Sequence, residues 1–149
     1  MQLHRESPRT RKGFTLVELA VVIVIIGVLA AFGVPKFLNS VERSKAAEAF
    51  AYLSAVRSAE ERYLAKEGVY TADLTALDIN LQAPKYFTVP TTITVTAGTA
   101  TSPPAWSLTL TRVAATSSKG AYTVTFTEGG FDSTNSTITA NPEINPLGS

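Results

Sequence analysis

Residues 13–35 read GFTLVELAVVIVIIGVLAAFGVP, and this long apolar stretch is the strongest structural signal in the chain. From Phe14 to Val34 it contains a single charged residue, Glu18. A helix of these 21 residues would be about 31 Å long, which matches the roughly 30 Å hydrocarbon core of a bilayer. We therefore expect a membrane-spanning helix over residues 14–34.

The residues before this stretch, MQLHRESPRTRKG, are polar and show no helical or strand periodicity. They carry four basic side chains and one acidic side chain: Arg5, Arg9, Arg11, Lys12 and Glu6. We interpret residues 1–13 as a leader peptide and not as part of the fold. A basic cluster directly before an apolar span predicts that the N-terminus stays in the cytoplasm and that everything after Pro35 is exported.

A second helical pattern predicts that the helix continues over residues 35–67 as an amphipathic segment. Pro35 removes one backbone hydrogen bond, so we expect a kink or a loosened turn there. Beyond it, apolar side chains recur within an arc of about 120° when plotted at about 100° per residue. They are Leu38, Val41, Ala49, Tyr52, Leu53, Val56, Ala59 and Tyr63, with Lys45 as the one clear interruption.

The other side of this segment is predicted to face solvent. Glu60 and Glu61 are adjacent and therefore point in different directions on a helix, which argues against a catalytic pair and favours solvated surface. Arg57 and Glu61 have the spacing of a helical ion pair. Gly68 is a plausible end of the helix.

Residues 68–149 begin with a loop and then become rich in threonine and β-branched residues. Three stretches alternate with period two and predict half-buried strands. Their apolar residues are Ile93, Val95 and Ala97; Trp106, Leu108 and Leu110; and Tyr122, Val124 and Phe126. We expect a weaker strand around Thr137 to Thr139. Because a helix stripe and a one-faced sheet each need a partner, we expect an α+β fold with a small antiparallel sheet packed on residues 35–67.

Composition argues against several functions. The chain has no cysteine, and its one histidine, His4, lies in the leader. A chain without that leader lacks the residues that most catalytic triads and zinc sites need. Beyond the leader there is no basic footprint for nucleic acid. We interpret Asp73, Asp78, Asp132 and Glu143 as scattered loop residues and not as calcium ligands. We therefore predict no enzyme activity, no metal, no cofactor and no direct nucleic-acid binding.

The Gly-Phe-Thr-Leu-Val-Glu motif that starts at Gly13 closely resembles the processing site of type IV prepilins. In that family a membrane-embedded prepilin peptidase cuts after the glycine and methylates the new amino terminus. The resemblance implies that Gly13 precedes the cut and that Phe14 becomes N-methylphenylalanine. Glu18, Gly27 and Pro35 also stand where the family uses such residues.

This resemblance implies a structural subunit of a type IV pilus-like filament that serves adhesion, motility or DNA uptake. The implied partners are further copies of the chain, the prepilin peptidase, and an assembly platform with its ATPase. The implied location is the bacterial inner membrane before assembly, with the N-terminus cytoplasmic, and the cell surface afterwards. A pseudopilin of a type II secretion system, which forms a short periplasmic pseudopilus, is the alternative within the same family.

A physical argument also supports a role of Glu18 in assembly. A carboxylate at the centre of a spanning helix costs about 2.5–3.5 kcal/mol by insertion scales, and less near a helix end. If the chain begins at Phe14, its amine is cationic, and an adjacent subunit displaced along the bundle could place that amine against Glu18. Small residues such as Gly27 would let the apolar helices approach closely.

Two other interpretations of the apolar stretch stay open. A secretory signal peptide could be cut near Val28-Leu29-Ala30, although the stretch exceeds the usual length of about 7–15 residues and leaves Glu18 unexplained. A generic single span could instead anchor an exported enzyme or binding module.

Overall fold

The computed structural model of the chain describes residues 13–148. The chain divides into two compact units, residues 1–36 and residues 37–149. The first contains the apolar stretch, and we call the second the head. Most of the predicted leader, residues 1–12 with His4 and the basic cluster, lies outside the described residues.

The predicted helix is a single element, α1, which runs over Leu16–Glu67 and contains 52 residues. It ends as predicted at Gly68, whose φ of 79° lies in the left-handed region that glycine enters without steric cost. The Gly68 N–H still donates to the carbonyl of Leu64 at 2.8 Å. Pro35 lies inside α1, and the kink expected there stays a prediction.

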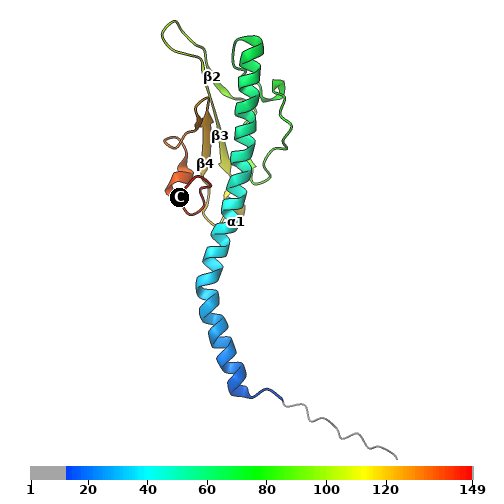
Figure 1. Cartoon of the computed structure of the whole chain (residues 1–149), viewed down its shortest axis with the longest axis vertical. Coiled ribbons are helices and arrows are strands. Elements are labelled where there is room, and N and C mark those ends of the chain that lie inside the picture. The colour runs from blue at the N-terminus through cyan, green and yellow to red at the C-terminus, as the bar shows by residue number, and fades with distance from the viewer. Residues whose placement is uncertain (1–12, 149) are drawn as a thin grey trace, which may run out of the picture. The chain divides into compact units, whose positions relative to one another are not determined.

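The head contains a five-stranded antiparallel sheet beside the later part of α1 (Figure 1). The strands are β1 (Phe87–Thr88), β2 (Thr94–Thr96), β3 (Ala105–Arg112), β4 (Thr123–Thr127) and β5 (Gly130–Phe131). β3 pairs with β1, β2 and β4, and β5 pairs with β4. Three 3-10 helices lie in the connections: η1 (Leu74–Ala76), η2 (Ala114–Thr116) and η3 (Thr137–Ala140).

The core lies between one face of the sheet and one face of α1. Alternate residues of β3 and β4 are buried on that face: Trp106, Leu108, Leu110, Val124 and Phe126. They belong to one apolar cluster with the helix stripe that includes Ala49, Leu53 and Val56. The Phe50 ring meets the Phe126 ring edge to face at 5.6 Å. This arrangement confirms the predicted α+β fold.

Some expectations about the head were wrong. The segment around Thr137 to Thr139 is the 3-10 helix η3 and not a strand. There the Thr123 N–H donates to the Thr137 hydroxyl at 2.8 Å, so a side chain takes the place of a backbone ladder. Leu38 was predicted on the buried stripe but is 46% exposed, because burial on α1 begins one turn later at Glu42. The strands β1 and β5 were missed because two residues cannot display a period of two.

Candidate functional site

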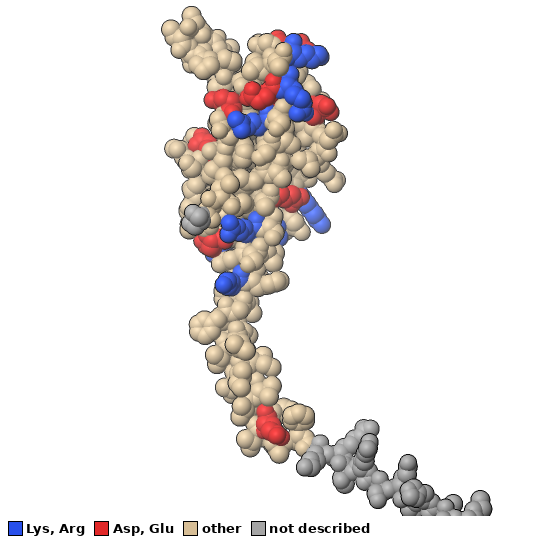
Figure 2. All heavy atoms as spheres, viewed as in Figure 1, with Lys and Arg blue, Asp and Glu red and all other residues tan. Residues whose placement is uncertain are grey.

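The apolar segment, residues 14–34, has no cover within the single chain. Its large apolar side chains are between 48% and 88% exposed. The most apolar window of α1 has a mean hydropathy of 2.8, and none of it is buried. Within the described residues, α1 is the one helix that is long and apolar enough to cross a membrane. Figure 2 shows this part of the chain almost free of charge, with a single acidic group. An apolar surface of this extent requires lipid or protein against it.

The single acid of this segment, Glu18, takes part in the start of the helix. The N–H and the hydroxyl of Thr15 both donate to Glu18 Oε2 at 2.8 Å. In return, the Glu18 N–H donates to the Thr15 hydroxyl at 3.2 Å. Because α1 begins at Leu16, this is a capping box, in which two otherwise unpaired N–H groups of the first turn are satisfied. Glu18 therefore already has a local function in the isolated subunit.

This capping box was not predicted, although the sequence carries its signal. A threonine followed three residues later by glutamate, directly before an apolar run, is the pattern of a helix start. The same threonine and glutamate belong to the motif that resembles a prepilin processing site. A single hexapeptide therefore contains both a local folding signal and the predicted processing signal.

The other predicted site residues lie along the same exposed segment. Gly13 and Phe14 precede α1, and Phe14 is 82% exposed. A Cβ at Gly13 or at Gly27 would meet nothing within 4 Å. The fold of one subunit therefore gives no reason for glycine at either position. The roles predicted for Gly13, Phe14, Glu18, Gly27 and Pro35 stay predictions, because each involves a second molecule or the membrane.

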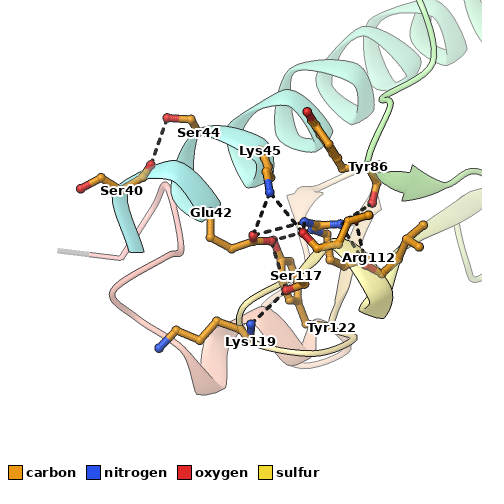
Figure 3. Close-up of polar contacts among 11 residues, drawn as sticks. Ser40, Glu42, Ser44, Lys45, Tyr86, Arg112, Ser117, Lys119 and Tyr122 are labelled. Atoms are coloured by element: carbon orange, nitrogen blue, oxygen red, sulfur yellow. Dashed lines mark hydrogen bonds and ion pairs between the residues drawn. The ribbon is translucent and has the colours of Figure 1, made fainter. Parts of the chain in front are cut away.

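A second polar site, unpredicted by the sequence analysis, lies where α1 enters the head (Figure 3). Arg112 at the end of β3 donates from Nε to Glu42 Oε1 at 2.6 Å and from Nη2 to Glu42 Oε2 at 3.2 Å. Both side chains are buried. The Tyr122 hydroxyl donates to Glu42 at 3.0 Å, and Lys45 Nζ lies 3.5 Å from the same carboxylate. Burial acts to raise the pKa of Glu42, but the hydrogen bonds from Arg112 and Tyr122 and the nearby positive charges outweigh it, and the pKa is lowered.

The remaining donors of Arg112 fasten the neighbouring loops. Nη1 donates to the carbonyls of Tyr86 and Val113, both at 3.0 Å, and to the Thr116 hydroxyl at 2.6 Å. Nη2 also donates to the Thr116 carbonyl at 2.6 Å. A buried guanidinium with its donors satisfied ties α1, β3 and two loops together. Arg112 continues the inward alternation of Trp106, Leu108 and Leu110 along β3. A charged residue at an inward position of a strand is the signal from which this buried polar site could have been predicted.

A third glutamate of α1, Glu60, is buried and has no cationic partner among the described residues, 13–148. It was predicted as solvated surface, and this was wrong, because its exposed fraction is 0%. Its Oε2 accepts the Thr71 N–H at 3.1 Å, whereas its Oε1 has no partner among residues 13–148. Burial raises the pKa of Glu60, the Thr71 N–H opposes the shift, and the charge of Glu61 adds to it.

The surroundings of Glu60 also differ from the predicted helical ion pair. Glu61 accepts the Tyr70 hydroxyl at 3.1 Å, and burial together with this acceptor raises the pKa of Tyr70 to about 12. Arg57 donates instead to the carbonyl of Glu128 at 2.8 Å. Arg57 and Glu61 are therefore each engaged with the segments that cover the end of α1.

Comparisons with known proteins agree with the sequence motif. Residues 8–34 match the family model of the prokaryotic N-terminal methylation motif. The chain is 42% identical over 71 residues to the fimbrial protein EcpC of Eikenella corrodens, covering 48% of this chain and 46% of that protein. It is 41% identical over 71 residues to the type IV major pilin protein PilA of Myxococcus xanthus, covering 48% of this chain and 32% of that protein. It is 35% identical over 69 residues to the type IV major pilin protein PilE of Neisseria gonorrhoeae, covering 46% of this chain and 41% of that protein.

These alignments cover less than half the length of each of the three relatives. No solved structure matches the chain significantly. All three relatives are named as structural pilins or fimbrial proteins and not as enzymes. The methylation motif and the aligned N-terminal half are therefore similar to those of type IV pilins and fimbrial proteins.

Proposed function

We propose that this chain is the structural subunit of a type IV pilus-like filament, which is processed after Gly13 and polymerises through residues 14–34. One observation carries the proposal: the large apolar side chains of residues 14–34 are exposed along the whole segment, and its single charged residue is Glu18, near the start of α1. Sequence similarity supports the same function, since the three relatives are named as pilins or fimbrial proteins.

Processing is proposed to be the work of a prepilin peptidase. The methylation motif over residues 8–34 supports it. Gly13 lies outside α1, and the open space around its Cα means that a larger side chain would fit within the subunit. A need for glycine at position 13 would therefore come from the peptidase and not from the fold. Cleavage there would make Phe14 the N-methylated first residue.

Assembly is proposed to pair the new amine of one subunit with Glu18 of a neighbour. The pair neutralises two charges that would each be costly away from water, and it fixes the stagger between adjacent helices. The apolar faces then exchange lipid for neighbouring helices, which small residues such as Gly27 allow to approach closely. An assembly platform and its ATPase would draw the subunit from the inner membrane, where it spans once with the N-terminus cytoplasmic.

The experiment uses the capping box to separate folding from assembly. Glutamine at N3 of a capping box still accepts the N-cap hydrogen bonds but carries no charge. Full-length wild type, Glu18→Gln, Glu18→Ala and the head control Glu61→Gln would be expressed in a piliated host that lacks its own major pilin. Sheared surface material would be examined by electron microscopy, and its N-terminus by mass spectrometry.

We expect wild type and Glu61→Gln to give filaments that begin at N-methylated Phe14. Glu18→Gln and Glu18→Ala should be processed but should form few or no filaments. Normal filaments from Glu18→Gln together with a defect in Glu18→Ala would reduce Glu18 to a helix cap and contradict the charge pairing. A Gly13→Leu chain should stay at full length in the inner membrane.

A further inference from the structure

One end of the head, which we call the base, is built from three segments that meet at one turn of α1. Arg43 Nη2 lies within 3.2 Å of the Pro146 carbonyl and 3.4 Å of the Gly148 carbonyl. Lys45 Nζ donates to the Thr116 carbonyl at 3.2 Å. The base comprises residues 37–45, 112–119 and 143–148.

The base carries most of the exposed apolar surface of the head. Among residues 37–148, six large apolar side chains are exposed, and four of them lie at the base. These are Phe37 at 68%, Leu38 at 46%, Val113 at 39% and Leu147 at 63%. The other two, Val69 and Leu81, lie in the loops that follow α1. Four apolar side chains gathered from three segments indicate a contact surface.

The C-terminal turn is constructed around an outward leucine. The Leu147 N–H donates to Asn145 Oδ1 at 3.0 Å, and the Gly148 N–H donates to the Asn145 carbonyl at 3.1 Å. Arg43 binds the carbonyls on both sides of Leu147. A Cβ at Gly148 would approach the Pro142 carbonyl oxygen to 2.8 Å, so the turn requires glycine there. The backbone of this turn is satisfied, while its one large apolar side chain faces out of the head.

Charge also distinguishes the two ends of the head. The base has four basic side chains and two acidic ones: Arg43, Lys45, Arg112, Lys119, Glu42 and Glu143. The opposite end, formed by residues 57–78 and Glu128, has three basic and six acidic side chains. These are Arg57, Arg62, Lys66, Glu60, Glu61, Glu67, Asp73, Asp78 and Glu128. The apolar end is therefore also the positively charged end.

We infer that the base is a lipid-contact surface, which rests on the headgroup layer of an anionic membrane before the subunit is assembled. The inference rests on the proposed function, because it takes residues 14–34 to span the bilayer. Phe37 follows Val34 by about 4.5 Å of helix, and the headgroup layer is about 5–7 Å thick on each side. Apolar burial combined with attraction to anionic lipids is the means by which interfacial surfaces bind.

The test places an indole on the base and measures its contact with lipid. The chain has one tryptophan, Trp106, which is 2% exposed and gives a constant background. Full-length Leu147→Trp and Val113→Trp would be reconstituted into phosphatidylcholine and phosphatidylglycerol vesicles with bromine on the acyl chain near the headgroup. Leu81→Trp is the matched control, since Leu81 is 50% exposed but lines a hollow with Ser58 and Arg62 of α1, away from the base.

We expect bromine to quench the indole at positions 147 and 113 and to leave Leu81→Trp and wild type unchanged, with weaker quenching when phosphatidylglycerol is omitted. The two base positions lie in different segments, so misfolding of one variant leaves the other informative. Chains that float with the vesicles but show equal quenching at positions 147, 113 and 81 would overturn the inference and leave the proposed function intact. Indoles at positions 147 and 113 that are unquenched in vesicles and become shielded from solvent only in assembled filaments would also overturn the inference. The surface in contact with the base would then belong to a second copy of the chain. Chains that do not float with vesicles would contradict the membrane span itself.

Discussion

Glu42 and Glu60 are the same residue type on the same helix, and the head buries both, yet it treats them in opposite ways. They are eighteen residues apart, which is about five full turns, so they point in the same direction from α1. Glu42 meets Arg112, Tyr122 and Lys45, and its pKa is lowered. Within the part of the chain that the structure describes, Glu60 accepts one backbone N–H and meets no cation, and its pKa is raised.

This difference shows that position on a helix does not decide what burial does to a charge. Burial of a carboxylate is unfavourable unless a charge and hydrogen bonds replace the lost water. At Glu42, Arg112 at the end of β3 supplies both the charge and the hydrogen bonds, and this pair holds α1 against the sheet. At Glu60 they are missing, so the end of α1 carries an unfavourable charge close to Thr71 in the loop that follows.

The largest expected effect comes from removing the cation at the favourable site. Arg112→Met leaves Glu42 buried and unpaired, and we expect it to lower the free energy of unfolding by about 3–5 kcal/mol. Denaturant unfolding of the full chain in detergent would measure it. Arg57→Met is the control, because Arg57 binds a carbonyl from an exposed position, and its loss should be much smaller. Equal losses in the two variants would contradict the special position of Arg112.

The next effect comes from removing the anion at the same site. Glu42→Gln keeps the shape of the side chain but deprives Arg112 of its counter-charge, and we expect a loss of about 2–3 kcal/mol. Combining it with Arg112→Met should cost less than the sum of the two single losses, because the two side chains form one interaction. Additive losses in this double-mutant cycle would show that Glu42 and Arg112 act independently.

Glu60→Gln should have the opposite sign at neutral pH. The amide still offers an oxygen to the Thr71 N–H but removes the buried negative charge, so we expect a gain in stability on the order of 1 kcal/mol. Glu61→Gln, on the exposed neighbour, is the control and should change little. A loss of stability in Glu60→Gln comparable to that of Glu42→Gln would remove the contrast between the two sites.

The smallest expected effect is in the pH dependence. Glu42 has a folded pKa below the ordinary value of 4.5, so its contribution is complete above that value and is lost as pH falls through the folded pKa. Glu60 has a folded pKa above 4.5, so the head gains stability as pH falls from that folded pKa toward 4.5. We therefore expect the unfolding midpoint to rise in mild acid and to fall again in stronger acid.

Thermal unfolding as a function of pH would check this profile. Glu60→Gln should abolish the rise in mild acid and leave the fall in stronger acid in place. A rise that persists in Glu60→Gln would assign it to another titrating group. Asp73, Asp132 and Glu143, whose pKa values are lowered by local hydrogen bonds and in Glu143 chiefly by Lys119, add to the fall and not to the rise.

Much of the fold was predictable because it depends on short-range patterns. The apolar run and the amphipathic stripe predicted α1, and Gly68 predicted its end. Alternation predicted β3 and β4, whose inward residues are buried as expected. The two-residue strands and η3 were not predicted, because their conformation depends on residues that are close in space and not in sequence.

The candidate site was predictable only in part. The motif at Gly13 and its similarity to pilins followed from the sequence, and the Thr15–Glu18 capping box could have followed from it as well. The pairing of Glu42 with Arg112 could not, because 70 residues separate them. Gly13, Phe14, Gly27 and Pro35 have predicted roles that concern other molecules, and the structure of one subunit contains no such contact.

Local patterns in the sequence were enough to predict a long helix with an apolar first half, a small sheet packed on its second half, and a prepilin-type start. They were enough because hydrophobic periodicity, capping and turn residues act over a few positions along the chain. Tertiary packing was needed to show which buried glutamate receives a cation, and which apolar side chains remain exposed at the base of the head. These outcomes depend on where β3, the loops and the C-terminal turn meet α1, and that meeting is set by packing between segments far apart in sequence.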